Sequence, residues 1–172
     1  MYPIDFFPRA VRLYPEREAL IGAGQVLTYA ALAARVDAAA CALQQMDAEP
    51  GTRVGICAGN TVDHVVALLA VLAAGKVWVP LNWRNPASEL NRIIAFTEPT
   101  IVLAEPAHLA ALDLSGVKAV RALGEASGAH TALETAAPYP DRVQKLALLG
   151  FAYPMSVNPA LQALADSGAY TV

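Results

Sequence analysis

The sequence predicts an α/β protein in which helices flank a parallel sheet. The first observation is that short apolar runs bounded by turn residues alternate with helical patterns across residues 51–122. Such β-α-β alternation is typical of parallel strands joined by right-handed crossovers, with helices on the faces of the sheet. The second observation is composition: 56% of the 172 residues are hydrophobic and 16% are charged, which suits a buried core and excludes a wholly disordered chain.

The first portion of the chain, residues 1–48, precedes this alternation and predicts a helix, a hairpin and a second helix. Asp5 is the expected cap of the first helix, whose helical apolar spacing ends at Leu13. Thr28 is the expected cap of the second helix, in which apolar residues follow helical spacing to about Met46.

A hairpin is expected between these two helices, over residues 18–28. Two short β-type runs there flank Gly22 and Gly24, which favours a tight turn with glycines at positive φ. The G-x-G pair does not indicate a dinucleotide-binding loop, because a third glycine and a helix at the right place are missing.

The second portion, residues 51–122, predicts four strands and three helices in alternation. The first strand contains the apolar run V-G-I-C-A at 54–58, bounded by turn residues, which is typical of a strand buried on both faces. Thr61 is the expected cap of the first of these helices, and Gly75 is its expected C-terminal glycine. The expected strands are 53–58, 76–81, 100–104 and 117–121, and the expected helices are 62–74, 86–97 and 106–112.

The pattern weakens after residue 122. Residues 123–142 are rich in Ala, Gly, Ser and Pro, which indicates a loop or linker. Residues 143–172 contain only Lys145 and Asp166 as charged residues. We therefore expect a low-charge tail that differs in character from the rest of the chain.

Charge and hydropathy exclude several classes of function. The net charge is −3 and no basic tract occurs, so nucleic-acid binding is not expected. The longest apolar run, residues 65–75, is well short of the ~20 residues that cross a bilayer, so no membrane span is expected. The N-terminus lacks the pattern of a secretory signal, and Cys41 and Cys57 have no metal-type spacing. Both cysteines are expected to be reduced, buried thiols of a cytoplasmic protein.

Three segments between residues 27 and 82 resemble a known family. L-T-Y-A-A-L at 27–32 matches an L-T-Y-x-x-L helix opening, and G-T-R-V-G-I at 51–56 matches a G-D-R-V-x-I strand. The third segment, at 69–82, matches a long L-x-A-x-x-x-A-G-x-x-x-V-P-L-N block. Together they resemble the adenylate-forming (AMP-binding) enzyme superfamily, of the acyl-CoA synthetase type, and the resemblance covers residues 3–122.

The resemblance implies a fold that is the incomplete front part of the acyl-CoA synthetase N-terminal domain. Enzymes of this family use ATP and Mg²⁺ to convert a carboxylic acid, such as a fatty acid, into an acyl-adenylate. They then pass the acyl group to the thiol of coenzyme A (CoA). Trp78 and Asn82 resemble fatty-acyl and aryl-acyl ligases more than peptide-synthetase modules.

The motifs that perform adenylation in the family have no match in this sequence. The phosphate-binding loop, Y-T-S-G-T-T-G-x-P-K-G, is expected soon after residue 140, and no such run occurs. The ribose-binding acid motif, the hinge and the late catalytic lysine also find no matching positions. No catalytic residue or metal ligand is therefore assigned. We expect an N-terminal fragment that is inactive alone and binds no cofactor, with ATP, Mg²⁺ and CoA used by the intact family enzyme.

Two further hypotheses stay open beside the inactive ligase fragment. One is a non-catalytic α/β binding or partner protein that pairs with a separate catalytic chain. The other is a decayed gene product without a role. By resemblance, residues 1–48 pack against later segments in the whole enzyme, so we expect an exposed apolar patch there, and self-association or a complementing chain.

Arg84 is the one binding residue that the resemblance implies. It follows the V-P-L-N block, where some CoA ligases of the family place an arginine against the CoA phosphates. The planar donor fork of arginine suits phosphate recognition, although a solvated loop arginine is the alternative. Trp83 beside it has two interpretations, an aromatic wall of the same site or ordinary packing.

Other polar candidates have weaker patterns. Asn60 at a strand-to-helix junction suits either anion binding or helix capping. His64 lies in the first turn of a helix with no paired acid or nucleophile at a meaningful spacing, which argues against a catalytic role. His130 and Glu134 stand four residues apart, but two ligands alone do not predict a metal site.

Overall fold

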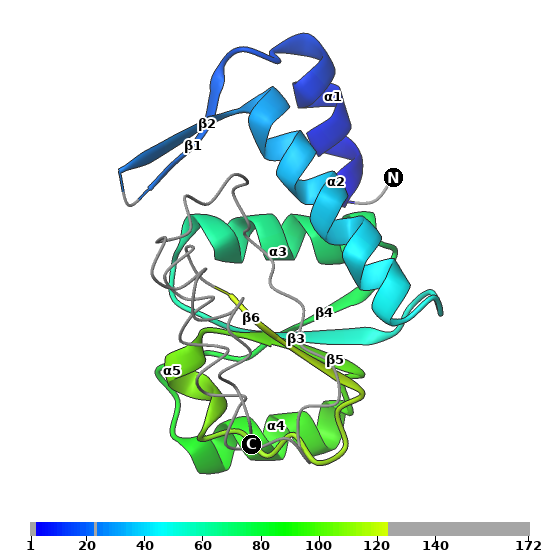
Figure 1. Cartoon of the computed structure of the whole chain (residues 1–172), viewed down its shortest axis with the longest axis vertical. Coiled ribbons are helices and arrows are strands. Elements are labelled where there is room, and N and C mark those ends of the chain that lie inside the picture. The colour runs from blue at the N-terminus through cyan, green and yellow to red at the C-terminus, as the bar shows by residue number, and fades with distance from the viewer. Residues whose placement is uncertain (1–2, 23, 124–172) are drawn as a thin grey trace, which may run out of the picture.

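The computed structural model describes residues 3–22 and 24–123 of the chain (Figure 1). Apart from Leu123, the predicted linker and tail, 123–142 and 143–172, lie outside the described residues. The described part contains a parallel four-stranded sheet between two layers of helices, which confirms the predicted α/β fold class. None of the helices in this part is long and apolar enough to cross a membrane.

The first portion contains the predicted elements, with exceptions at its hairpin turn and its first helix. Strands β1 and β2 pair antiparallel, and Gly24 in their turn has a φ of +76°. Gly22 has no positive φ, contrary to expectation, because it pairs with Gln25 as the last residue of β1. Thr28 caps α2, because its hydroxyl accepts the N–H of Ala31 at 3.2 Å. Asp5 makes no side-chain cap, contrary to expectation, because its backbone is already helical, with φ −64° and ψ −21°. The elements are a 3-10 turn (Pro3–Asp5), α1 (Phe6–Leu13), β1 (Glu18–Gly22), β2 (Gln25–Thr28) and α2 (Tyr29–Met46).

The parallel sheet has the strand order β4-β3-β5-β6. Helices α2 and α3 cover one face, and α4 and α5 cover the other (Figure 1). The chain runs from β3 outward to β4, and then returns past β3 to β5 and β6. This reversal places β3 and β5 side by side, although the helices that follow them lie on opposite faces. The elements are β3 (Arg53–Cys57), α3 (Val62–Ala73), β4 (Val77–Pro80), α4 (Ala87–Thr97), β5 (Ile101–Ala104), α5 (Pro106–Leu109) and β6 (Ala119–Ala122).

The ends of the helices follow the local sequence. Thr61 caps α3 by accepting the N–H of His64 at 3.2 Å, as predicted. Gly75 follows α3 with a φ of +72°, a left-handed conformation that favours glycine. Helix α5 is shorter than predicted, because the chain continues in tighter turns in which the N–H of Leu112 bonds to the carbonyl of Leu109 at 3.2 Å.

The core lies on both faces of the sheet. Val54 and Ile56 of β3 pack with α2 and α3, whereas Cys57 of the same strand packs with α4. Strand β5 is buried at every position and divides its side chains between the faces in the same way. Such two-sided burial explains why β5 and the buried residues 54–57 of β3 carry no polar side chain.

The two cysteines differ in exposure. Cys57 is fully buried in β3, but Cys41 is exposed on α2. The expectation of two buried thiols is therefore wrong for Cys41. The buried face of α2 includes Val36, Ala40 and Leu43, and position 41 lies beside this helical stripe, not within it.

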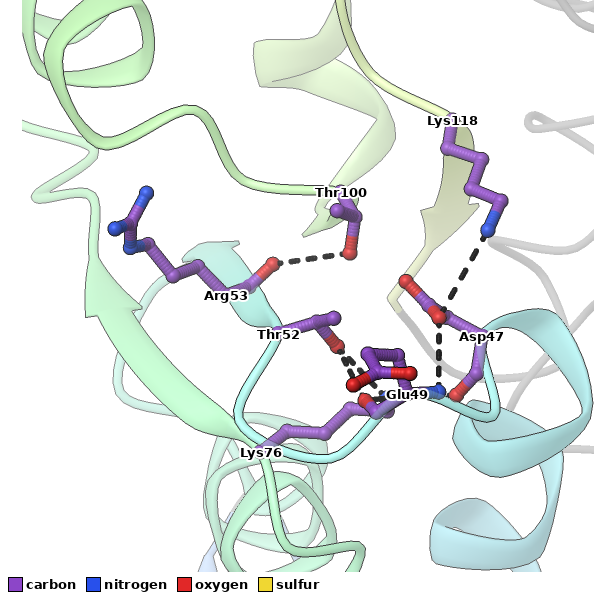
Figure 2. Close-up of polar contacts among 7 residues, drawn as sticks. All are labelled: Asp47, Glu49, Thr52, Arg53, Lys76, Thr100 and Lys118. Carbon is purple, nitrogen blue, oxygen red and sulfur yellow. Dashed lines mark hydrogen bonds and ion pairs between the residues drawn. The ribbon is translucent and has the colours of Figure 1, made fainter.

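A closed polar network lies at the amino ends of the strands, as Figure 2 shows. The Nζ atom of Lys76, just before β4, donates to the carbonyl oxygens of Asp47 at 2.7 Å and Glu49 at 3.1 Å. It also donates to Oγ1 of Thr52 at 2.8 Å. The Asp47 carboxylate accepts the N–H of Glu49 at 3.1 Å and lies 3.8 Å from Nζ of Lys118. We call Asp47, Glu49, Thr52, Lys76 and Lys118 the amino-end network. Its hydrogen bonds hold the connection between α2 and β3 against the start of β4.

Candidate functional site

The topology indicates where a binding site belongs. In open α/β sheets, ligands bind beyond the carboxyl ends of the strands, where neighbouring strands lead to helices on opposite faces. Here those neighbours are β3 and β5, which lead to α3 and α5. The residues that follow these strands, together with the loop after the adjacent β4, form the carboxyl-end cluster: Gly59, Trp83, Arg84, Glu105 and His108.

Glu105 links two loops of the carboxyl-end cluster. Its Oε1 atom accepts the N–H of Gly59 at 3.0 Å, from the turn after β3. Its Oε2 atom lies 3.5 Å from Nε2 of His108, one helical turn further along the chain. The Glu105 side chain is 27% exposed and that of His108 is 23% exposed, so solvent reaches both partners.

The turn after β3 is held from both sides. The carbonyl oxygen of Gly59 accepts the N–H of Thr61 at 2.9 Å and lies 2.8 Å from Nδ1 of His64. Thr61, and not Asn60, caps α3, so the capping interpretation of Asn60 is wrong. Asn60 is instead an exposed residue of the turn. This contact of His64 with a backbone carbonyl gives the imidazole a structural role.

The loop after β4 presents an aromatic and a cationic side chain together. The Asn82 side chain accepts the N–H of Arg84 at 3.1 Å, which shapes the loop. The guanidinium carbon of Arg84 lies 5.1 Å from the ring centroid of Trp83, a cation–π arrangement. The ring of His108 stacks on Trp83, with centroids 5.6 Å apart and an interplanar angle of 29°.

The structure therefore brings Arg84 and Trp83 together with two residues that sequence reasoning missed, Glu105 and His108. A signal for these two is present, because they follow a buried strand directly and lie one helical turn apart. The sequence does not reveal the strand order. That order places the carboxyl end of β5 near the carboxyl ends of β3 and β4. His130 and Glu134 lie outside the described residues.

The chemistry of the cluster favours binding over nucleophilic catalysis. Burial raises the pKa of the Cys57 thiol to about 11, and the nearby Glu105 carboxylate adds to the rise. The thiol is therefore protonated and unreactive at neutral pH. Residues 3–22 and 24–123 hold no group of three or more His, Cys, Asp or Glu side chains that could bind a metal ion.

The chain matches the model of the AMP-binding enzyme family over residues 7–158. It therefore belongs to this family, as the segments between residues 27 and 82 predict. The match runs past residue 122, where the sequence resemblance ends, and includes the first part of 143–172.

Relatives from two branches of the family are similar to this chain. One of the linear gramicidin synthase proteins of Brevibacillus parabrevis is 36% identical over 109 residues, which are 60% of this chain and 1% of that protein. A structure described as a long-chain-fatty-acid CoA ligase from Rhodopseudomonas palustris superimposes with a TM-score of 0.66 at 26% identity, over 72% of this chain and 33% of that one. The nonribosomal peptide synthetase FmoA3, bound to α-methyl-L-serine-AMP, gives a TM-score of 0.60 at 29% identity, over 67% of this chain and 13% of that one.

The chain spans a third or less of the length of each of these proteins. The relatives include both CoA ligases and peptide synthetases, whose shared property is a place in the AMP-binding family.

Proposed function

We propose that this chain is the front part of an ATP-dependent acyl-CoA ligase. The whole enzyme activates a carboxylic acid as an acyl-adenylate and transfers the acyl group to CoA in the cytoplasm. Family membership over residues 7–158 supports the first step. The observation that supports the second step is the exposed guanidinium of Arg84 lying over Trp83 at the carboxyl end of β4.

Arg84 has the properties of a phosphate-binding residue. Its side chain is exposed, and no ion pair in the described part of the chain occupies its guanidinium. The Trp83 ring supports one face of the group and restricts its motion, while the N–H donors at its rim stay available. A planar fork of this kind binds phosphate oxygens through two parallel hydrogen bonds.

The phosphate groups distinguish CoA from an acceptor thiol that has none. CoA carries phosphate groups at the nucleotide end of its pantetheine arm, whereas a free pantetheine thiol has none. A phosphate contact by Arg84 therefore favours a CoA ligase. The 172 residues lack the family's phosphate loop, so we propose that this chain does not form the adenylate by itself.

A peptide-synthetase adenylation unit is the second candidate, because the gramicidin synthase and FmoA3 similarities favour it. The acceptor in that case is not CoA, and Arg84 is an ordinary loop residue.

Either candidate requires further polypeptide. The exposed apolar side chains of the first portion support a complementing chain or self-association. These are Phe6 (59% exposed), Leu13 (53%), Tyr14 (47%), Ile21 (67%) and Val26 (54%).

Calorimetric titration of the 172-residue chain with CoA, and separately with pantetheine, tests the proposal. We expect CoA to bind more tightly, and Arg84→Gln to weaken CoA binding by about tenfold, because it removes charged hydrogen bonds to phosphate. Arg92→Gln is the matched control, since Arg92 is an exposed arginine on α4. Equal affinities for CoA and pantetheine would contradict the CoA assignment and favour the peptide-synthetase candidate.

ATP–pyrophosphate exchange tests the inactivity of the chain. We expect no exchange with any carboxylic acid, because no residue of the chain matches the family's phosphate loop or late lysine. A measurable exchange rate from the purified 172-residue chain would contradict this part of the proposal.

A further inference from the structure

Helix α1 presents both apolar and cationic side chains to solvent. Phe6, Arg9 and Leu13 are spaced three and four residues apart, which places them on one face of the helix. All three are exposed, and the two apolar side chains, Phe6 and Leu13, are 59% and 53% exposed. Phe7 instead packs against the core that α2 and α3 form. The outward face of α1 therefore carries a cation between two large apolar groups.

The segment 6–17 is basic, although the chain as a whole is acidic. Its one acidic residue is Glu16, and its three arginines are Arg9, Arg12 and Arg17, so its net charge is +2. The rest of the chain carries −5, because the whole chain carries −3. No ion pair among the described residues involves any of the three arginines. Their charge is available to an anionic partner.

A second aromatic side chain with a cation beside it follows the end of α1. Tyr14 is 47% exposed, and the guanidinium carbon of Arg17 lies 5.0 Å from the centroid of its ring. Basic side chains interleaved with aromatic and aliphatic ones are typical of segments that lie in the interface of a membrane. We call the following residues the α1 surface: Phe6, Arg9, Arg12, Leu13, Tyr14 and Arg17.

We propose that the α1 surface binds the surface of an anionic phospholipid membrane, with α1 lying among the headgroups and not crossing the bilayer. Phe6 and Leu13 enter the boundary between headgroups and acyl chains, while Arg9 and Arg12 contact the anionic headgroups. The position of α1 permits this contact, because the helix lies at one end of the molecule and α4 and α5 lie at the other (Figure 1). The inference goes beyond the proposed ligase function and does not depend on a CoA contact by Arg84.

A second copy of the chain fits the α1 surface less well than a membrane does. In a symmetric dimer through this surface, the arginine-bearing face of one copy meets the same face of the other, and like charges repel. The hairpin differs, because Glu18 is the only charged residue of β1 and β2. Its exposed pair, Ile21 and Val26, lies directly opposite in the strand register and suits a further polypeptide.

The shape of the α1 surface also favours lipid over an acidic protein. A two-turn helix offers a small, convex contact, and a protein partner needs a rigid groove that matches it. Lipid headgroups rearrange around the helix, so an anionic membrane supplies negative charge and an apolar layer without such a groove.

Vesicle flotation tests the inference with the 172-residue chain. Flotation is suitable because self-associated protein does not rise in a density gradient unless it binds lipid. We expect the chain to rise with vesicles in which about a third of the lipid is phosphatidylserine, and to stay at the bottom with phosphatidylcholine alone. Salt at about 1 M should release the chain, because the Debye length falls to about 3 Å.

Arginine variants test the contribution of charge. The double variant Arg9→Gln, Arg12→Gln should weaken binding to the anionic vesicles by about fivefold for each charge removed. Arg92→Gln is the matched control, because Arg92 is exposed on α4 at the other end of the molecule (Figure 1). This control should bind the vesicles as the wild-type chain does.

Phenylalanine variants test whether α1 enters the apolar layer. Phe6→Ser should weaken binding by about tenfold, because a partly exposed ring is no longer removed from water. Phe96→Ser is the matched control, because Phe96 is 87% exposed on α4, and it should bind normally. Circular dichroism verifies that each variant is folded.

Three results would overturn the inference. The first is a chain that does not rise with anionic vesicles, which leaves the α1 surface to a further polypeptide. The second is equal binding to both kinds of vesicle. The third is a loss of binding in the two α4 controls as large as the loss in the α1 variants. The CoA titration is a separate measurement, so failure of the proposed function is distinguishable from each of these results.

Discussion

The two ends of the sheet use polar side chains in opposite ways. At the amino ends, Lys76 is only 5% exposed and its ammonium donates to three oxygens of the preceding loop (Figure 2). At the carboxyl ends, Trp83 is 39% exposed and Arg84 is exposed on its ring. Polar groups that are buried and fully bonded hold loops in place. Polar groups that keep free donors in solvent are available to a ligand.

The difference follows from the path of the chain at each end. At the amino ends, the connection after α2 folds across the start of β3 and β4, so its carbonyl groups turn inward and need a donor. Lys76 provides that donor. At the carboxyl ends, β3 leads to α3 on one face of the sheet and β5 leads to α5 on the other, so the two loops diverge. Arg84 lies beside this divergence, in the loop after the adjacent β4, and its side chain stays exposed.

Removal of the Lys76 ammonium should give the largest effect on stability. Lys76→Met removes the ammonium that donates to the carbonyl oxygens of Asp47 and Glu49 and to the hydroxyl of Thr52. The buried Asp47 carbonyl loses this donor, whereas the Glu49 carbonyl still accepts from the Thr52 hydroxyl at 3.1 Å. We expect a loss of about 3 kcal/mol in the free energy of unfolding, measured in urea. Lys118→Met is the control, because that side chain is 64% exposed and should cost less than about 1 kcal/mol. A loss for Lys76→Met as small as the one expected for Lys118→Met would show that the amino-end network is not structural.

The second effect concerns the pH dependence of stability at the same end. The N–H of Glu49 lowers the pKa of the Asp47 carboxyl; burial opposes this, and Thr100 and Lys118 assist it. A carboxyl whose pKa is lowered on folding stabilises the protein above its unfolded pKa, near 4, and that contribution disappears as the pH falls through the folded pKa. Asp47→Asn should therefore destabilise the chain at neutral pH and converge with the wild type at acid pH, as the pH falls through the folded pKa of Asp47.

Urea unfolding at several pH values measures this convergence. Asp37→Asn is the matched control, because Asp37 is exposed on α2, outside the amino-end network. A constant difference between wild type and Asp47→Asn from neutral to acid pH would argue that the Asp47 charge contributes nothing.

The sequence predicted the elements well because each depends on local pattern. Thr28 and Thr61 cap their helices as expected, and Gly24 and Gly75 adopt the positive φ that their turns require. The error at Cys41 arose because an alanine-rich helix has weak contrast between its faces. Such a sequence shows that a helix forms but not which residues it buries.

The candidate site was only partly predictable for a different reason. Arg84 and Trp83 were found through a motif that is continuous in sequence. Glu105 and His108 belong to the site because of the strand order. A sheet with β3 between β4 and β5 places them beside the loop after β4. Lys76 was predicted as an ordinary strand residue, since its three acceptors lie in a loop more than 20 residues earlier.

The smallest effect should come from the carboxyl-end cluster, and it is the sharpest test of the contrast. Glu105→Gln keeps the acceptor for Gly59 and removes only a partly exposed ion pair, so the free energy of unfolding should change by less than about 0.5 kcal/mol. Glu105→Ala also removes the acceptor and should cost about 1 kcal/mol. If Glu105→Gln cost as much as Lys76→Met in the same urea measurement, both ends would be structural. The free donors of Arg84 would then be a weaker argument for ligand binding.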